Sequence, residues 1–325
     1  MITNIEFLEE GIECKKLEKY ILTEEDKKLF PGYTFKNLDE EPMEDSEDDE
    51  NERIYKEDIL FSTIVNLEEA SYIDIIAGNR ESTEYFIHHE IQLSDLIYDS
   101  VYLKKEKQYI GVATSSPDVE IYDALLFNPL VPQIKLLGHE DEVNTITYDG
   151  TDIMTGSNDK TIIQWDLEKK KPKEKYEMGV EVNYLESNEN ILGGILGNNE
   201  IFLRNGNDTL KTKFESEPQK LKFYNDKLLA SDEDGFFYVY DLRMFDSPLI
   251  KKGLHRKCIT AFDVANQCLI TASTDESLKL WNYETLELQK KIQTGEPMFS
   301  VKFCPYVENY CAYGGKDLRV INMLQ

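Results

Sequence analysis

A repeat of about forty residues runs through the last two-thirds of the chain and constrains its fold. A bulky residue followed directly by Asp or Asn occurs six times, at spacings of 43, 39, 36, 41 and 40 residues. The six pairs are Tyr122-Asp123, Trp165-Asp166, Arg204-Asn205, Tyr240-Asp241, Trp281-Asn282 and Ile321-Asn322. A period of this length, sustained over 200 residues, indicates repeated structural units and not a single enzyme core.

Each period ends in a short apolar segment that follows a turn rich in Gly, Asp, Asn or Ser. The six segments read DVEIYD, TIIQWD, EIFLRN, FFYVYD, SLKLWN and LRVIN. Short strands with such regular turns are typical of a four-stranded antiparallel sheet that recurs as a propeller blade. The sequence therefore predicts an all-β, seven-bladed β-propeller. Blades two to seven are expected at residues 95–136, 138–178, 179–214, 218–253, 255–294 and 295–325.

Blade one needs a different assembly, because residues 59–65, 72–77 and 84–91 supply only three strands. We expect residues 1–8 to add the fourth strand, which makes residues 9–57 an insertion and residues 58–325 the main body of the propeller. Within the insertion, Thr23 is the expected N-cap of a short helix at residues 23–29. Residues 39–52, of which ten of fourteen are acidic, are expected to be disordered. Blade seven has three expected strands, so either residues 3–8 or another segment occupies its outer edge, or the edge is open to a partner.

The balance of charges limits the partners that the protein can bind. The net charge is −27, and without the ten acidic residues of the run at 39–52 it is still −27 + 10 = −17. Because phosphate attraction dominates non-specific nucleic-acid binding, any RNA contact must come from a local basic patch. The five cysteines form no C-x-x-C pair, which favours buried thiols in a reducing compartment. The acidic N-terminus and the lack of long apolar runs favour a soluble intracellular protein.

Blades three and six share a set of four side chains in the same register. The pairs are His139/His255, Thr155/Thr271, Asp159/Asp275 and Trp165/Trp281, each offset by 116 residues. A loop histidine can bond a turn carboxylate through one ring nitrogen and a strand hydroxyl through the other, and the hydroxyl can reach the indole N–H. We therefore expect two structural tetrads, and we interpret the histidines as structural and not as catalytic bases.

These landmarks resemble the WD-repeat family. A closer resemblance is carried by YKEDILF, YFIHHEIQLS, QYIGVATSSPDVEIYDALL, LLASDEDGFFYVYDLR and YCAYGGKDLRV, which occur in blade order together with an acidic insertion after the first strand. In this combination the chain is similar to the periodic tryptophan protein 1 family of nucleolar WD-repeat proteins. The insertion is short here, and Tyr122, Arg204, Tyr240 and Ile321 replace periodic tryptophans. The resemblance implies a scaffold in the nucleus and nucleolus that binds large-subunit assembly factors and pre-ribosomal RNA.

Two lysine-rich segments stand out from the acidic background. Lys104, Lys105 and Lys107 lie between the first two expected strands of blade two, and Lys169, Lys170, Lys171, Lys173 and Lys175 lie in the expected connection to the outer strand of blade three. Both connections emerge on the same propeller face, so the eight lysines are candidates for RNA contact. A third cluster, formed by Lys251, Lys252, Arg256 and Lys257, is expected on the opposite face. Simple solvation of charged loops explains the same pattern equally well.

No catalytic or cofactor-binding motif is present. The sequence has no phosphate-binding G-x-x-x-x-G-K, no nucleophile elbow and no H-E-x-x-H. His88 and His89 lie on an expected strand, so their side chains should point to opposite faces and not share a metal. Gly193-Gly194 and Gly314-Gly315 are interpreted as turns at strand ends. We expect no enzyme activity, cofactor, metal, small-molecule substrate or membrane association.

Three functions remain open at this stage, and the first is the ribosome-assembly scaffold. The second is a chromatin adaptor whose acidic surface binds basic histone tails. The third is a substrate receptor of a cullin–RING ubiquitin ligase, since Tyr240-Asp241-Leu242-Arg243 resembles the Trp-Asp-x-Arg signature of such receptors. Pairing of Arg243 with a neighbouring acid explains that last motif more simply.

Overall fold

The computed structural model describes residues 1–13, 18–19, 54–67, 70–80, 82–105, 107–127, 129–189, 191–206 and 208–323. These residues form strands and turns, with no helix among them. Accordingly, the described chain holds no helix that is long and apolar enough to cross a membrane. The helix expected at residues 23–29 and the acidic run at 39–52 lie outside the described residues.

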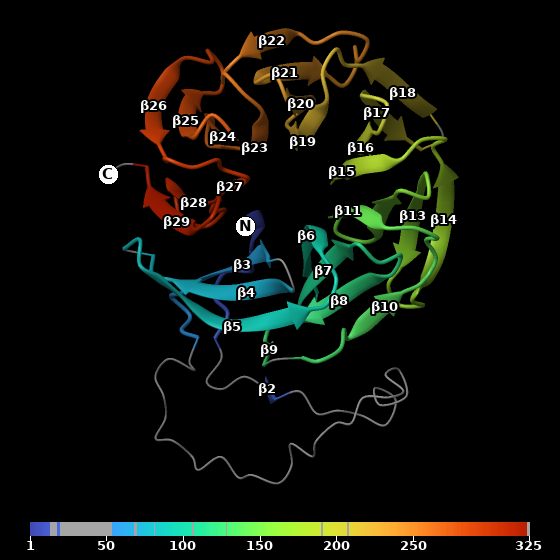
Figure 1. Ribbon diagram of the computed structural model, residues 1–325, viewed down its shortest axis with the longest axis vertical. Coiled ribbons are helices and arrows are strands. Elements are labelled where there is room, and N and C mark those ends of the chain that lie inside the picture. Colours follow the sequence, from blue (N-terminus) through green and yellow to red (C-terminus); the bar gives the residue numbers. More distant parts are fainter. Residues whose placement is uncertain are drawn as a thin grey trace.

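Seven antiparallel sheets are arranged in a ring, which confirms the predicted seven-bladed β-propeller (Figure 1). Blade one is β1 (Ile2–Phe7), β3 (Ile59–Asn66), β4 (Ser71–Gly78) and β5 (Tyr85–Leu93), and blade two is β6 (Ile97–Lys104), β7 (Gln108–Thr114), β8 (Val119–Asp123) and β10 (Ile134–Leu136). Blade three is β11 (Val143–Tyr148), β12 (Ile153–Ser157), β13 (Thr161–Asp166) and β14 (Lys171–Glu177), and blade four is β15 (Val182–Asn188), β16 (Ile191–Leu196), β17 (Glu200–Asn205) and β18 (Asp208–Lys213).

The remaining blades continue the same order from the centre outwards. Blade five is β19 (Pro218–Tyr224), β20 (Lys227–Asp232), β21 (Phe236–Asp241) and β22 (Ile250–Gly253), and blade six is β23 (Ile259–Ala265), β24 (Cys268–Ser273), β25 (Ser277–Asn282) and β26 (Leu288–Gln293). Blade seven is β27 (Ser300–Phe303), β28 (Tyr310–Gly314) and β29 (Leu318–Asn322). It has three strands in the described part of the chain. An additional short parallel pair joins β2 (Glu18–Lys19) to β9 (Leu126–Phe127), and the sequence pattern did not indicate it.

The N-terminal strand closes the ring. β1 is the innermost strand of blade one and pairs with β3, while it also contacts the innermost strands of blades seven and two. The main-chain N–H of Ile2 donates to the carbonyl of Gly315 at 2.8 Å, and Lys302 forms an ion pair with Glu6 at 2.6 Å. On the other side, the Asn4 side chain donates to the carbonyl of Ser100 at 2.9 Å. One strand therefore connects the last blade to the second.

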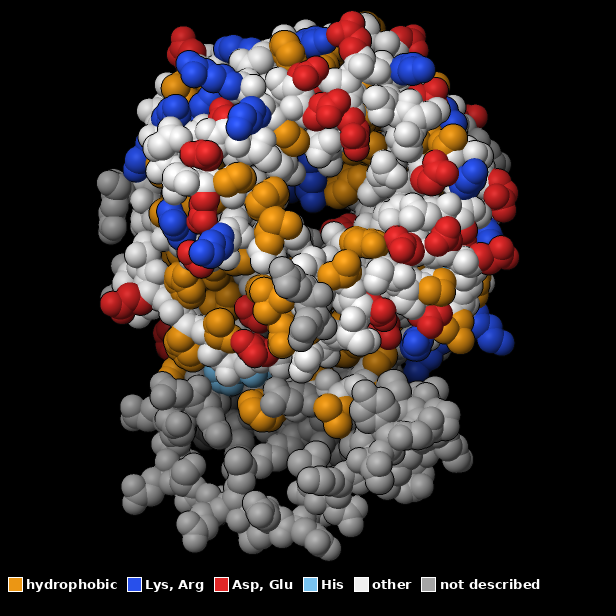
Figure 2. Space-filling view, viewed as in Figure 1, with side chains coloured by type: hydrophobic (Ala, Val, Ile, Leu, Met, Phe, Trp, Pro, Cys, Tyr) orange, Lys and Arg blue, Asp and Glu red, His pale blue; other side chains and the backbone are white. Residues whose placement is uncertain are grey.

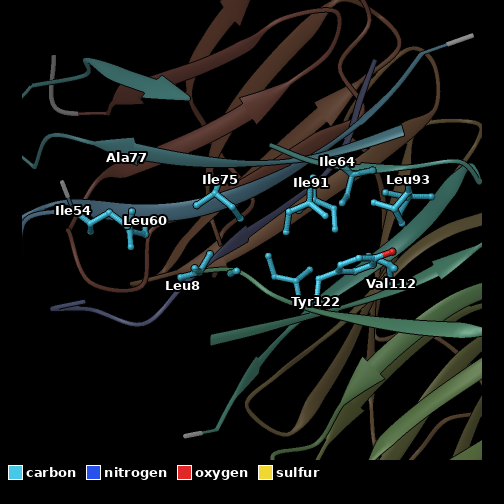
Figure 3. Close-up of a cluster of buried hydrophobic side chains, with 14 residues drawn as sticks. Leu8, Ile54, Leu60, Ile64, Ile75, Ala77, Ile91, Leu93, Val112 and Tyr122 are labelled. Carbon is cyan, nitrogen blue, oxygen red and sulfur yellow. The ribbon is translucent and has the colours of Figure 1, made fainter. Parts of the chain in front are cut away.

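The core consists of seven apolar clusters, one at each interface between neighbouring blades. Figure 3 shows the cluster between blades one and two, where Ile75, Ile91 and Leu93 of blade one pack against Val112 and Tyr122 of blade two. Each sheet is covered on both faces by its neighbours, which explains why the middle strands are apolar throughout. Burial of apolar side chains between adjacent blades therefore contributes to stability.

The two glycine pairs that were expected in turns at strand ends have different outcomes. Gly314 is the last residue of β28 and Gly315 follows it, as expected. Gly193 and Gly194 were expected in a turn, and this is wrong, because both lie inside strand β16. A Cβ atom on Gly194 would lie 2.3 Å from the ring of Phe202, and one on Gly193 would lie 3.1 Å from Phe223. Two aromatic rings from both sides of the sheet thus occupy the space that side chains would need. The glycines are needed for packing and not for turning the chain.

Candidate interaction surfaces

In blade three, four side chains from a loop and two strands form one hydrogen-bonded set. His139 Nδ1 lies 2.9 Å from Asp159 Oδ2, and His139 Nε2 lies 2.8 Å from Thr155 Oγ1. The indole Nε1–H of Trp165 donates to the same Thr155 hydroxyl at 2.8 Å. The Trp165 side chain is fully buried in the cluster between blades two and three. The set therefore ties the loop before the blade to its second and third strands.

Blade six repeats this arrangement with the same atoms. His255 Nδ1 lies 3.0 Å from Asp275 Oδ2, its Nε2 lies 2.7 Å from Thr271 Oγ1, and Trp281 Nε1 donates to that hydroxyl at 2.9 Å. The ionised Asp275 carboxylate can only accept, so Nδ1–H donates to it. Nε2 of the neutral ring is then unprotonated and accepts from the Thr271 hydroxyl, whose oxygen accepts from the indole. The arrangement thus selects one neutral tautomer of the imidazole.

Burial acts in the same direction on the histidine. Burial lowers the pKa of His255 to about 4, with a further contribution from the Lys279 cation, although Asp275 opposes the shift. Burial also lowers the pKa of His139. Both imidazole rings have no exposed surface. A fully enclosed, neutral imidazole whose two nitrogens are both engaged cannot accept a proton from a bound molecule, so the geometry suits a structural role.

The histidine pair on β5 differs from its expected arrangement. His88 and His89 were expected to point to opposite faces, but their Nδ1 atoms lie 3.0 Å apart. The cause is a β-bulge, since Ile75 pairs with His89 and Ile76 pairs with Ile87, which leaves His88 as the extra residue. Burial lowers the pKa of His89 to about 4, and His88 adds to the shift. No group of three or more His, Cys, Asp or Glu side chains suited to a metal ion occurs among the described residues.

The first lysine segment lies at the turn between β6 and β7, and two of its cations are paired. Lys104 forms an ion pair with Glu9 at 2.6 Å, and Lys107 pairs with Asp123 at 2.9 Å. Lys105 is exposed, with no ion pair within the described part of the chain. Local carboxylates therefore neutralise part of the positive charge that the sequence placed here.

The second lysine segment is distributed differently from the prediction. Only Lys169 and Lys170 lie in the connection, because strand β14 already begins at Lys171. A register shift between the pairs Gln164↔Glu174 and Trp165↔Pro172 leaves Lys173 as an extra residue, so Lys171 and Lys175 lie on opposite sides of that exposed outer strand. Lys169 pairs with Asp166 at 2.6 Å and Lys173 pairs with Asp152 at 2.5 Å. The lysines thus extend along the rim of blade three and do not gather on one face.

This distribution is part of a wider pattern that the sequence analysis missed. The outer strands of blades three to six carry lysines at Lys171, Lys173, Lys175, Lys211, Lys213, Lys251, Lys252, Lys290 and Lys291. In Figure 2, basic side chains lie mainly around the periphery of the visible face, with acidic ones between them. The signal was present in the sequence, since these lysines follow the bulky residue of the landmark by 6 to 12 residues in blades three to six. The third basic cluster, at residues 251–257, belongs to the same rim through Lys251 and Lys252.

The central channel is polar and its charges are balanced. A cavity of about 130 Å³ is lined by the inner strands β1, β15, β19, β23 and β27. Within it, Lys302 pairs with Glu6 at 2.6 Å and Lys222 pairs with Asp263 at 3.0 Å. The Asp263 carboxylate raises the pKa of Lys222, and Lys220 lies 4.4 Å from the ring of Tyr184. Because these lysines face carboxylates or a ring, the channel does not present a free cationic site for an anion.

The motif that suggested a ubiquitin-ligase receptor is only partly explained by internal contacts. The main-chain N–H of Arg243 donates to Asp241 Oδ1 at 2.9 Å. The Arg243 side chain is exposed, and it has no ion pair with an acid in the portion of the chain that the structure describes. The expected pairing of Arg243 with a neighbouring acid is therefore not seen there.

Comparison with known proteins agrees with the architecture. A family model described as WD domain, G-beta repeat matches residues 130–166, which end at the Trp165-Asp166 landmark of blade three. A WD repeat-containing protein of Dictyostelium discoideum is 22% identical over 200 residues, covering 59% of this chain and 9% of its own length. Maintenance of telomere capping protein 5 of Saccharomyces cerevisiae is 26% identical over 97 residues, covering 28% of this chain and 8% of its own length.

This chain thus spans less than a tenth of the length of either relative. Neither relative therefore carries its activity or partners over to this chain. The family model matches the segment that contains the tetrad of blade three. The chain therefore contains one segment that matches the WD repeat model, set in a ring of seven antiparallel sheets.

Proposed function

We propose that this protein is a non-enzymatic scaffold in nucleolar assembly of the large ribosomal subunit, where it binds assembly factors and pre-ribosomal RNA. The observation that carries this proposal is the resemblance to the periodic tryptophan protein 1 family, which extends in order from blade one to blade seven. A propeller alone does not define a function, because many unrelated functions use the same fold. The blade-specific segments and their order are what favours this family over other repeat proteins.

The surface chemistry supports a scaffold role. The candidate histidines are enclosed and the central channel is charge-balanced, so the features that offer contact to partners are the rim, the loops and the exposed edges. Cations on four successive outer strands provide local positive charge on a protein whose net charge is −27. Phosphate contacts need such local charge, since an acidic protein otherwise repels RNA.

A second candidate function is a chromatin adaptor that binds basic histone tails. It is favoured by the charge of −17 that remains without the acidic run at residues 39–52. The same charge would attract any basic partner, including basic ribosomal components, so it does not separate the two functions. The exposed Arg243 side chain keeps the ubiquitin-ligase receptor as a third alternative.

Affinity purification of the tagged full-length protein, with sequencing of the co-purified RNA and identification of the proteins, tests these alternatives together. We expect large-subunit precursor RNA and assembly factors to be enriched over a tagged propeller of similar charge. Enrichment of histones without precursor RNA would support the chromatin adaptor. Enrichment of cullin–RING components that Arg243→Ala abolishes would support the ligase receptor, and either result would contradict the ribosomal role.

A further inference from the structure

Blade seven differs from the other six blades in its outer edge. Six sheets have four strands each, whereas the described part of blade seven has the three strands β27, β28 and β29. The third strand, β29, therefore occupies the edge of its sheet, a position that an outer strand covers in every other blade. An exposed strand edge presents main-chain donors and acceptors to which an additional strand can pair.

The hydrogen-bond pattern shows which main-chain groups face this edge. In blades three to six, the residue five positions before the bulky residue of the landmark directs its carbonyl outward. This carbonyl accepts a main-chain N–H from the residue just after the outer strand. The four acceptors are Lys160, Asn199, Gly235 and Glu276. The equivalent residue in blade seven is Lys316. Because main-chain groups in a strand alternate in direction, Leu318 and Val320 also direct theirs outward. The N–H of Met323 donates to Asn309 on the inner side, which fits the same alternation.

The edge of β29 also differs chemically from the outer edges of blades three to six. Those outer strands consist mostly of exposed residues and carry two or three lysines each. Such charged outer strands resist pairing with other chains. In β29, by contrast, Leu318, Val320 and Ile321 are all buried or partly buried, and one residue, Arg319, is a cation. The strand therefore has the composition of a covered third strand.

A run of exposed apolar residues lies beside this edge. Tyr85, Phe86 and Ile87 begin β5 of blade one and are 37%, 44% and 49% exposed. The hydroxyl of Tyr85 donates to the carbonyl of Leu318 at 2.5 Å, which places this run against β29 and leaves one lone pair of that carbonyl for an added strand. Figure 2 shows apolar side chains gathered where blade seven meets blade one. Three consecutive exposed apolar residues are costly for solubility unless a partner covers them.

We propose that the open edge of β29 binds an extended, lysine-containing segment of a partner protein, which adds antiparallel to β29 as the fourth strand of blade seven. The outer strands of blades three to six are the template for its chemistry, since each combines two or three lysines with few apolar residues. The charge of −27 favours the same basic segment over an acidic one and opposes pairing with a second copy of this chain.

The other blades also indicate which position of the segment should be apolar. Leu318 corresponds to Leu278 in blade six and to Ile162 in blade three, at the same distance from the landmark. Opposite these two residues the outer strands place Ile292 and Tyr176. Both side chains pack into the cluster shared with the next blade. The partner should therefore place an aliphatic or aromatic residue opposite Leu318, where it contacts the apolar run at residues 85–87.

A synthetic peptide with the sequence of residues 288–295, which includes β26 and its two lysines without Glu284 and Glu287, is the probe for this site. We expect it to bind the full-length protein in a fluorescence anisotropy titration and to slow amide hydrogen exchange in β29. Val320→Pro removes an outward N–H and should weaken binding about ten-fold. Val320→Ala is the matched control, because it shortens the same side chain, keeps the N–H and should bind nearly as well as the wild type.

Two further probes separate strand pairing from simple charge attraction without changing the protein. A peptide methylated on alternate main-chain nitrogens keeps its charge but loses donors, and should bind about ten-fold more weakly. A peptide with both lysines changed to glutamate should also lose affinity. Equal binding of the methylated and parent peptides would overturn the proposal. A second result would also overturn it. If the protein dimerises, does not bind the peptide, and loses the dimer on Val320→Pro, the occupant of the edge is a second copy of this chain. The proposal does not depend on the ribosomal role, because peptide binding and RNA co-purification are measured separately.

Discussion

Each tetrad histidine links the turn carboxylate and the strand hydroxyl of its blade through one hydrogen bond from each ring nitrogen, so its loss should reduce stability. We predict that His255→Ala lowers the free energy of unfolding by about 1–3 kcal/mol, because the buried Thr271 hydroxyl and the Asp275 carboxylate both lose a partner. Thermal and urea unfolding of the variant measure this loss. Gln289→Ala, an exposed residue on β26 of the same blade, should have little effect. Unchanged stability combined with the loss of one specific partner would show that His255 belongs to a binding site.

The same residue predicts a pH dependence whose sign can be derived. His255 has a folded-state pKa of about 4, below the ordinary value of 6.5. Between these values the unfolded chain binds a proton that the folded protein does not, so stability is fully present above pH 6.5 and declines as the pH falls towards 4. The loss attributable to His255 is on the order of 3 kcal/mol. Urea unfolding at pH 7, 6 and 5 should show a steeper decline for the wild type than for His255→Ala, and parallel curves would contradict the assignment.

At the scale of elements, the glycines of β16 show how closely the blades pack. We predict that Gly194→Ala destabilises the protein by about 1–3 kcal/mol, because the new Cβ would lie 2.3 Å from a ring atom of fully buried Phe202. Gly253→Ala is the matched control, since its Cβ would meet nothing closer than 3.5 Å. Urea unfolding of both variants tests the comparison. Equal stability of the two variants would mean that β16 shifts easily at the blade interface.

Strands and turns were predictable from the sequence where the repeat recurred. They were missed where a bulge, a close packing contact or a long-range strand pair determined the geometry. The landmark period predicted blades two to seven and their order, because each of these blades carries a bulky residue followed by Asp or Asn, whereas blade one has no such landmark. The turn wrongly expected at Gly193-Gly194 is a strand whose glycines are required by packing of the neighbouring rings. The approach of His88 to His89 results from a β-bulge. The pairing of β2 with β9 joins segments more than 100 residues apart, and no short-range pattern encodes it.

At the scale of the whole molecule, the sequence identified the candidate residues but not always how they are arranged in space. The tetrad partners followed from an exact offset between two repeats, so their contacts were accessible to sequence reasoning. The eight candidate lysines were identified as residues, but their ion pairs with Glu9 and Asp123 connect distant positions or different strands. The extension of positive charge along the rim became visible only when the outer strands were compared across four blades.

The last prediction concerns how an acidic propeller attracts RNA. Replacing Lys104, Lys105, Lys107, Lys169, Lys170, Lys171, Lys173 and Lys175 by Ser should weaken binding to a pre-ribosomal RNA transcript in filter-binding assays. Four of these lysines pair with carboxylates, so the variant that changes only Lys105, Lys170, Lys171 and Lys175 should retain most of the effect. Each lost phosphate contact should flatten the salt dependence by about 0.7 to 0.9 in the slope of log K against log salt.

The control for that prediction is a variant in which Lys251, Lys252, Arg256 and Lys257 are replaced by Ser. It loses the same four positive charges at another position, so it tests whether the position of the charges affects RNA affinity. We expect the control variant to bind RNA more tightly than the variant of Lys105, Lys170, Lys171 and Lys175, with both proteins folded as judged by circular dichroism. Equal losses would indicate diffuse attraction to the whole rim, which also carries Lys211, Lys213, Lys290 and Lys291. If neither variant loses affinity, RNA does not bind through these lysines, and protein partners would have to bring the propeller to the pre-ribosome.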